Sequence, residues 1–130
     1  MQTKGNTEVI DITSQVADRV RESGAKDGTV TVFVPGSTAG VSTIEYEGGL
    51  VADIHSVWER IAPREIPYRH DAAWGDGNGH SHIRSFLLGP SLVVPFVNRR
   101  LTLGTWQQIV LVDFDNRPRS RDIVVQIMGD

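Results

Sequence analysis

The residues best suited to chemistry lie in one glycine-rich stretch in the middle of the chain. It reads Tyr68-Arg69-His70-Asp71 and then Asp76-Gly77-Asn78-Gly79-His80-Ser81-His82, so three of the four histidines and two aspartates fall within thirteen residues. Imidazole and carboxylate groups are ligands for zinc and similar divalent ions, and they also act as general acids and bases near neutral pH. The stretch therefore predicts a metal site or an acid–base site, with a solvated turn that carries incidental histidines as the alternative.

His82 is the histidine that we expect to face such a site. His80 and His82 are two positions apart, and on a regular helix they would point to opposite sides. The apolar residues Ile83, Phe86 and Leu87 are expected to form the buried face of a short helix beside His82. We therefore predict His82, His70 and Asp76 as catalytic residues, and the same three as the ligands of a possible zinc or magnesium ion.

Two further segments carry polar groups that suit a ligand. The small-residue turn from Gly36 to Gly40 contains Ser37 and Thr38, whose hydroxyls, together with backbone N–H groups, would hold an anion. A plain tight turn is the alternative. Glu45 lies on the strand predicted after this turn, where it is a candidate base or metal ligand, or else a surface residue.

The C-terminal third of the chain supplies the remaining candidates. In Leu103-Gly104-Thr105-Trp106-Gln107 a glycine interrupts a strand pattern, and such a glycine often marks a close approach of the backbone. Trp106 and Gln107 are therefore candidates to line a pocket. Packing in the core is the alternative for Trp106. Arg119 and Arg121 flank the last turn, opposite Asp113 and Asp115. Both arginines are candidates to bind phosphate. The alternative, which we favour, is that they form a network of ion pairs with these aspartates.

The pattern of apolar residues predicts the elements that must position these groups. Helices are expected over 13–23, 50–61 and from about 80 to 88, and strands over 7–11, 29–34, 41–47, 91–97, 101–114 and 123–128. No period survives between Pro63 and Gly79, a length that is usually functional or disordered. The segments 109–112 and 123–125 are apolar at every position, as expected for strands buried on both faces in a sandwich or at a subunit interface.

Strands and helices do not alternate regularly, so a doubly wound α/β fold is excluded. The prediction is an α+β fold: one compact domain over residues 1–130, with a mostly antiparallel sheet or sandwich and about three helices.

Composition narrows the class of protein. The chain has 130 residues, 39% of them hydrophobic and 22% charged, and its formal net charge is −3. The negative charge gives no general attraction to nucleic acid, and no apolar run is long enough to span a membrane. The absence of cysteine excludes disulfides, thiolate zinc sites and a cysteine nucleophile. The N-terminal residues lack the apolar core of a signal peptide, which predicts a cytoplasmic protein without a nucleic-acid or membrane partner.

The motifs together resemble a known family. The run from Pro35 to Glu47, the H-x5-D-x-N-x3-H pattern from His70 to His82, and the L-G-T-W-Q motif with the following residues to Arg121 are similar to the YjbQ-like family, often labelled secondary thiamine-phosphate synthase. The resemblance implies a compact α+β domain that forms a homotrimer, with a pocket at the subunit boundary that contains the histidine–aspartate loop. It assigns motif positions to His70, Asp76, Asn78, His82, Glu45, Gly104, Trp106, Gln107 and Arg121. Gly36 departs from it, because many members have histidine there.

The activity that the resemblance implies is a weak or secondary synthesis of thiamine phosphate. In that reaction a pyrimidine-methyl diphosphate joins a thiazole phosphate and pyrophosphate is released. Asn78, Ser37, Thr38, Trp106, Gln107, Arg119 and Arg121 are then expected to bind a small phosphorylated substrate. The alternatives are a trimeric protein that binds a metal or phosphorylated metabolite without turnover, a phosphate-ester hydrolase, and a structural trimer whose loop contacts a partner.

Overall fold

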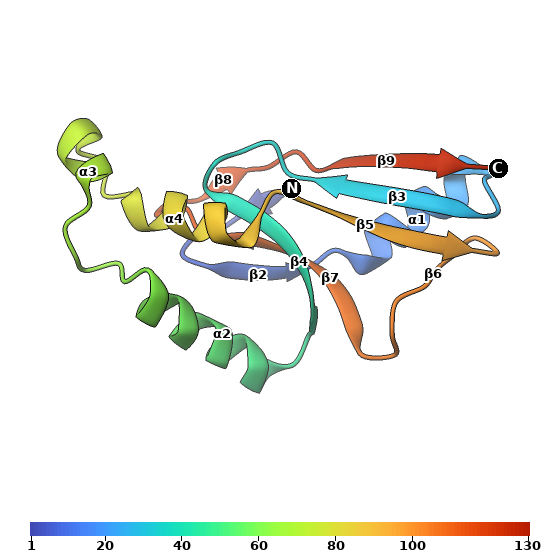
Figure 1. The fold of residues 1–130 in the computed structure, drawn as a ribbon, viewed down its shortest axis with the longest axis horizontal. Coiled ribbons are helices and arrows are strands. Elements are labelled where there is room, and N and C mark those ends of the chain that lie inside the picture. The colour runs from blue at the N-terminus through green and yellow to red at the C-terminus, as the bar shows by residue number, and fades with distance from the viewer.

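A computed structural model describes all residues, 1–130, as nine strands and four helices (Figure 1). The helices are α1 (Thr13–Ser23), α2 (Gly48–Ile61), α3 (Arg69–Trp74) and α4 (Gly79–Leu88). The strands are β1 (Gln2–Thr3), β2 (Glu8–Asp11), β3 (Gly28–Phe33), β4 (Ala39–Glu45), β5 (Ser91–Val97), β6 (Arg100–Leu101), β7 (Gln107–Asp113), β8 (Arg119–Ser120) and β9 (Val124–Gly129). The α+β class is confirmed, with four helices where about three were expected.

The strands form two main sheets, in which every pair is antiparallel. The inner sheet has the order β2-β7-β4 and the outer sheet the order β6-β5-β3-β9, while β1 and β8 form a separate two-stranded ribbon. One face of the inner sheet packs on the outer sheet, and the other is covered by α2 and α4. No helix combines the length and the apolar character needed to cross a bilayer.

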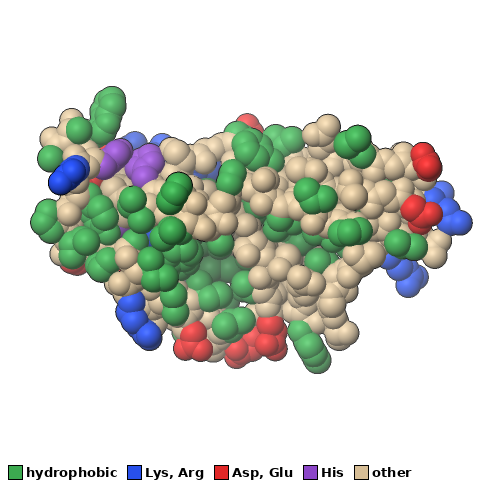
Figure 2. Space-filling view, viewed as in Figure 1, with side chains coloured by type: hydrophobic (Ala, Val, Ile, Leu, Met, Phe, Trp, Pro, Cys, Tyr) green, Lys and Arg blue, Asp and Glu red, His purple; other side chains and the backbone are tan.

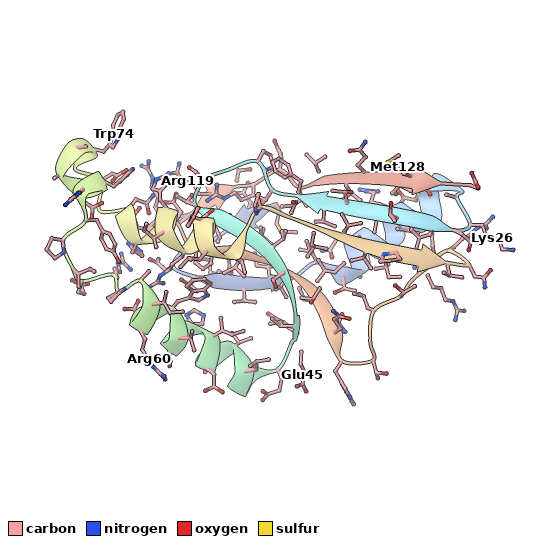
Figure 3. All side chains as sticks on the ribbon, viewed as in Figure 1. Lys26, Glu45, Arg60, Trp74, Arg119 and Met128 are labelled. Atoms are coloured by element: carbon pink, nitrogen blue, oxygen red, sulfur yellow. The ribbon has the colours of Figure 1, made fainter.

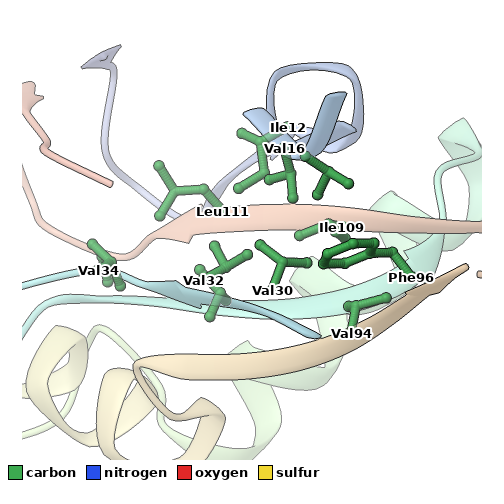
Figure 4. Close-up of a cluster of buried hydrophobic side chains, with 12 residues drawn as sticks. Ile12, Val16, Val30, Val32, Val34, Val94, Phe96, Ile109 and Leu111 are labelled. Carbon is green, nitrogen blue, oxygen red and sulfur yellow. The ribbon is translucent and has the colours of Figure 1, made fainter. Parts of the chain in front are cut away.

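Strand β7 is buried on both faces, as its continuous apolar sequence predicts. Ile109 and Leu111 point into the larger core, which lies between the two sheets and α1 (Figure 4). Val110 and Val112 point the other way, into a smaller core beneath α2 and α4. Phe114 extends this second core and meets Trp58 of α2 edge to face, with ring centroids 5.0 Å apart. Because β7 lies between two layers, alternating positions serve two different cores.

Strand β9 is buried on one face only within the single chain, so of the two expected settings the internal sandwich does not describe it. Ile123, Val125 and Ile127 pack against the larger core, but Val124 and Met128 lie on the outer face of the outer sheet and are 47% and 68% exposed. Val93 on β5 lies on that face too and is 59% exposed. The outer sheet therefore presents an uncovered apolar face.

The first two helices lie close to the predicted ranges, and a carboxylate accepts hydrogen bonds at the start of each. Asp11, which precedes the N-cap residue Ile12, accepts hydrogen bonds from the backbone N–H and the hydroxyl of Thr13. The carboxylate of Glu47 accepts from two backbone N–H groups in the first turn of α2, and these bonds hold the pKa of Glu47 below its ordinary value. Gly24 closes α1 in the left-handed conformation that glycine adopts readily.

The apolar stripe predicted for α2 is only partly covered. Leu50, Ile54 and Trp58 are half-buried, whereas Val57 and Ile61 are 43% and 56% exposed. The reason is geometric: α2 packs at the rim of the inner sheet, α4 contacts it only toward its C-terminal end, and no further layer covers its other side.

The prediction for α4 has the right range and the wrong face. Ile83, Phe86 and Leu87 are 43%, 81% and 51% exposed. The buried side consists of polar residues, namely His80, Ser81, Arg84 and Ser85. Their hydrogen bonds to the backbone explain the reversal, because Ser81 donates to the Phe114 carbonyl at 2.5 Å and Ser85 to the Ala39 carbonyl at 2.6 Å.

Candidate functional site

Helices α3 and α4, which carry His70 and His82, meet at one end of the molecule (Figure 1). Helix α3 lies in the segment that has no apolar period, and it ends at Gly75 in the left-handed conformation. Gly79 begins α4, and its backbone N–H donates to Asp71 Oδ1 at 2.8 Å. A Cβ at Gly79 would lie 2.6 Å from the Tyr68 side chain, so glycine permits the close approach of the two helices.

His70 and His82 are neighbours in this arrangement. Their ring centroids are 4.4 Å apart and the ring planes are tilted by 40°. His70 Nδ1 lies 3.4 Å from Asp76 Oδ1 and 3.6 Å from Asp71 Oδ1, and it makes no hydrogen bond although it is buried. The rings remain half-buried, and histidine reaches the surface over this end of the molecule (Figure 2). The structure thus joins two imidazoles and two carboxylates in one solvent-accessible cluster.

A divalent ion fits part of this cluster. Ligand atoms of His70, Asp71 and Asp76 all lie within 4.8 Å of one another. Two ligands bound at about 2.1 Å to a tetrahedral zinc are about 3.4 Å apart, which agrees with the observed spacing around the unpartnered Nδ1. The set therefore contains Asp71 beside the predicted ligands His70 and Asp76, and the predicted ligand His82 is not part of it. The position of Asp71 next to His70 was the available signal.

Asn78 anchors the histidine loop to the sheet from inside the protein. Its side chain is buried, its Nδ2 donates to Asp115 Oδ2 at 3.1 Å, and its Oδ1 accepts from the backbone N–H of Asn116 at 3.1 Å. Asp76 continues the connection, since its carbonyl accepts from the Asn116 side chain at 2.7 Å. Asn78 therefore positions α4, and both of its amide atoms are engaged by the protein.

Asp115 is the centre of a buried polar network. Thr38 Oγ1 donates to the same Oδ2 at 2.9 Å, and Arg119 Nε lies 3.0 Å from it. Burial alone would raise the pKa of Asp115, but the hydrogen bonds from Thr38 and Asn78 and the ion pair with Arg119 outweigh it and hold that pKa below its ordinary value. The turn at residues 36–40 and the last turn of the chain are thereby tied to the start of α4.

The two arginines of this network, Arg121 and Arg119, differ in burial. Arg121 is buried, and its Nε and Nη2 donate to the two oxygens of Asp113 at 2.8 and 3.0 Å, which raises the pKa of its guanidinium. Arg119 is about one-third exposed, and its Nε is the only one of its nitrogens that lies within ion-pair distance of a carboxylate. The ion-pair interpretation describes Arg121, whereas Arg119 keeps its outer nitrogens available for a ligand.

Ser37 and Thr38 also differ in burial. Thr38 is buried, and its hydroxyl both donates to Asp115 and accepts from Arg121 Nη2 at 2.6 Å. Ser37 is exposed at the tip of the turn. A Cβ on the neighbouring Gly36 would lie 2.8 Å from Arg121 Nη1, so the space beside Gly36 is taken up by an arginine.

A second buried cluster lies on the other side of α4. Arg84 donates to the Ala62 carbonyl at 3.1 and 2.9 Å, to Thr7 Oγ1 at 2.7 Å and to Glu59 at 2.7 Å, which lowers the pKa of Glu59. His80 is 2% exposed, and burial followed by the charge of Arg84 lowers its pKa. These residues fix α4 against the end of α2 and the N-terminal segment.

Glu45, Trp106 and Gln107 lie away from the histidines of the same chain. Glu45 pairs with Gln107 at the far end of β4 and β7, where Gln107 donates to Thr43 Oγ1 at 3.0 Å (Figure 3). Trp106 is 73% exposed in the loop before β7. None of the larger cavities is lined by His70, His82 or Asp76. Within one chain the predicted residues therefore form two groups.

Comparison with known proteins places the whole chain in one family. The family model described as "UPF0047 protein YjbQ-like" matches residues 1–130. A UPF0047 protein of Archaeoglobus fulgidus is 40% identical over 128 residues, which are 98% of this chain and 97% of the relative. Another UPF0047 protein, from Methanothermobacter thermautotrophicus, is 40% identical over 129 residues, 99% of this chain and 88% of the relative.

Solved structures agree in fold. A crystal structure described as a "YbjQ-like protein of unknown function" from Sulfolobus solfataricus has a TM-score of 0.91 and 34% identity, and the match covers 100% of this chain and 94% of that one. An uncharacterised protein of the YjbQ/UPF0047 family from Clostridium acetobutylicum has a TM-score of 0.85 and 34% identity, with 98% of each chain covered. The chain described here belongs to the YjbQ-like UPF0047 family.

Proposed function

We propose that the cluster of His70, His82, Asp71 and Asp76 is the active site of a metal-assisted transferase acting on small phosphorylated substrates. The reaction proposed is the synthesis of thiamine phosphate. The observation that carries the proposal is the buried, unpartnered Nδ1 of His70, held 3.4 and 3.6 Å from two carboxylates and beside a second imidazole. This arrangement suits a divalent ion next to a group that transfers protons.

The proposed reaction exchanges one bond for another at the methylene carbon of the pyrimidine. The thiazole nitrogen supplies an electron pair to form the new C–N bond. The C–O bond to the diphosphate breaks, and pyrophosphate departs with that bond's electron pair. Positive charge develops on the methylene group and negative charge on the leaving group, so catalysis requires orientation of the nitrogen and stabilisation of the departing anion.

The chain's own residues suit these requirements. His70, Asp71 and Asp76 would hold a divalent ion, which when bound neutralises charge on the diphosphate. The exposed outer nitrogens of Arg119 would contact phosphate oxygens, while its Nε stays fixed by Asp115. His82 would donate a proton to the departing pyrophosphate and regain it from water. Asn78 keeps helix α4, which carries His82, in place through its bond to Asp115.

A homotrimer is part of the proposal, because the cluster lies on an open surface. Exposed apolar side chains surround it: Trp74 on α3 is 76% exposed, and Phe86 on α4 is 81% exposed. A second copy seated there would cover these side chains and exclude water from the histidines. Assembly would also bring Glu45, Trp106 or Gln107 of one chain to the histidine cluster of another.

Metal binding is tested first, on protein purified without an affinity tag. We expect about one zinc or magnesium ion per chain, with the ion lost in His70→Ala and Asp76→Asn. His55→Ala is the matched control, because His55 lies on α2 outside the cluster and its replacement is expected to leave the metal content unchanged. A metal content that is zero, or equal in all these variants, would contradict the metal part of the proposal.

Activity is tested with the pyrimidine diphosphate and thiazole phosphate, by following thiamine phosphate and pyrophosphate together. His82→Ala is expected to lose turnover while His55→Ala keeps it. Release of phosphate from either substrate, without the joined product, would point to a hydrolase instead. Bound metal or substrate without any product would point to a binding protein.

Light scattering tests the assembly. We expect a trimer mass for the native chain and a smaller mass for Phe86→Asp, since a charge at this exposed position would be buried on assembly. A native mass equal to a single chain would contradict the enclosed site.

A further inference from the structure

The largest cavity lies at the end of the molecule opposite the histidines. It has a volume of about 610 Å³ and lies between α1, the β5–β6 turn and the loop that leads into β7. In Figure 3 the label of Lys26 marks this end and the label of Trp74 marks the α3 end. The volume is ordinary for a small-molecule site.

The wall of the cavity is polar and basic. It contains three arginines, Arg21, Arg99 and Arg100, and the polar residues Thr13, Asn98, Gln107 and Gln108. Ala17, Leu101 and Leu103 are its hydrophobic residues, and they leave a substantial apolar surface beside the charged groups. A wall of this composition suits an anion with hydrogen-bonding groups much better than an apolar ligand.

Two of the arginines have no acidic partner. Arg21 pairs with Asp18 one turn earlier on α1, but neither Arg99 nor Arg100 takes part in any ion pair of the structure. Lys26 adds a further positive charge at the adjoining surface. The chain as a whole has a net charge of −3, so unpaired arginines gathered in its largest cavity are a local departure from the general balance.

The backbone of the turn is arranged to present these arginines. Asn98 and Arg99 form the two-residue connection between Val97 and Arg100, with φ of 51° and 64°. Glycine is the residue usually favoured at the second position of such a turn, because left-handed backbone is unfavourable for a residue with a Cβ. The backbone N–H groups of Asn98 and Arg99 are held by Asp27 Oδ1 at 2.9 Å and the Lys26 carbonyl at 2.8 Å. Arginine thus occupies a rigid, strained position where glycine would be less costly, as is found at functional sites.

We infer that this cavity binds a small molecule that carries a phosphate or diphosphate group. Two unpaired guanidiniums, supported by Arg21 and Lys26, match a group with at least two negative charges and oxygens in a tetrahedral array. Gln108 makes no side-chain hydrogen bond within the chain and is available to the rest of the ligand. The inference goes beyond the proposed reaction, because it requires neither the histidines nor their metal. Gln107 is the one residue of the wall that the trimer proposal also uses, and Arg99 and Arg100 carry the inference without it.

The test is a titration with pyrophosphate, followed by the backbone amide signals of residues 98–101 in NMR spectra. We expect saturable binding that shifts these signals, and a dissociation constant at least about tenfold weaker in Arg99→Gly and in Arg100→Gln. Glycine accepts the left-handed backbone, so Arg99→Gly removes the guanidinium and keeps the turn. Arg60→Gln is the matched control on the exposed side of α2, with unchanged binding expected.

His82→Ala separates this inference from the proposed activity. Binding at residues 98–101 that persists in His82→Ala supports the cavity, whether or not the enzyme reaction is found. Binding lost in His82→Ala but kept in Arg99→Gly would place pyrophosphate at the histidine cluster and overturn the inference. Absence of saturation at about 10 mM pyrophosphate, or equally tight binding of citrate, would overturn it as well.

Discussion

The Asn78 amide donates to the Asp115 carboxylate at 3.1 Å, and both side chains are buried. The bond joins the first residue before α4 to the segment just after β7. The histidine-bearing helix is therefore held on the sheet by a polar contact, while its apolar residues Phe86 and Leu87 face outward. This contact has consequences for stability that are separable from activity.

Asp115→Asn is expected to destabilise the protein by about 3 kcal/mol, because it removes a buried charge and leaves the donors of Thr38 and Arg119 facing an amide. Urea unfolding measures the change. Asp53→Asn, on the exposed side of α2, is the matched control and is expected to change the free energy of unfolding by less than about 0.5 kcal/mol. Equal stability of the two variants would show that the network around Asp115 contributes nothing.

The dependence of stability on pH should report the ionisation of Asp115. The pKa of Asp115 is lowered in the folded protein, so the unfolded chain takes up its proton first as the pH falls. The stabilisation by Asp115 is complete above its unfolded pKa, about 3.9, and is lost as the pH falls from there toward the lower folded pKa. The free energy of unfolding, measured from about pH 6 down to pH 2, should fall less steeply below pH 4 in Asp115→Asn than in the native chain. Parallel curves would contradict the assignment.

His80 and His82 should separate folding from activity, although they are two residues apart. His82 is half-buried beside His70, so His82→Ala is expected to abolish turnover and to change stability by less than about 1 kcal/mol. His80 is 2% exposed, and His80→Ala leaves a cavity, with an expected loss of about 2–4 kcal/mol. Thermal unfolding and the product assay together give the two readouts. The reverse pattern would move the active histidine to position 80.

Much of the fold follows from apolar periodicity. The strand predicted at 91–97 is found with the same bounds, and the uninterrupted apolar run of β7 correctly indicates burial on both faces. The face of α4 is missed for a physical reason. Ser81, Ser85 and Arg84 are buried because distant backbone carbonyls accept their hydrogen bonds, and hydrophobicity carries no information about such partners. Helix α3, with six residues, is too short to show a period.

The candidate site, like the fold, could be predicted from the sequence only in part. His70, Asp76 and His82 are near in sequence, so their meeting within one loop follows from the sequence itself. Glu45 and Gln107 were predicted from their places on expected strands as well as from the family motif. Neither signal tells whether such residues meet the histidines within one chain or between chains. In the single chain they pair with each other, across β4 and β7, far from the histidines.

Gly36 offers a test of why this chain lacks the histidine that the family resemblance leads us to expect there. Its backbone is not left-handed, so alanine brings no conformational strain, but its Cβ would lie 2.8 Å from Arg121 Nη1. The planar guanidinium is held by two bonds to Asp113, and moving Nη1 weakens both. Gly36→Ala is therefore expected to cost about 1–2 kcal/mol in urea unfolding. Gly48→Ala, which meets open space at the start of α2, should leave stability unchanged or slightly higher. Equal stability of Gly36→Ala and Gly48→Ala would mean that Arg121 can move aside without loss of stability. The absence of the family's histidine at position 36 would then need a cause other than packing.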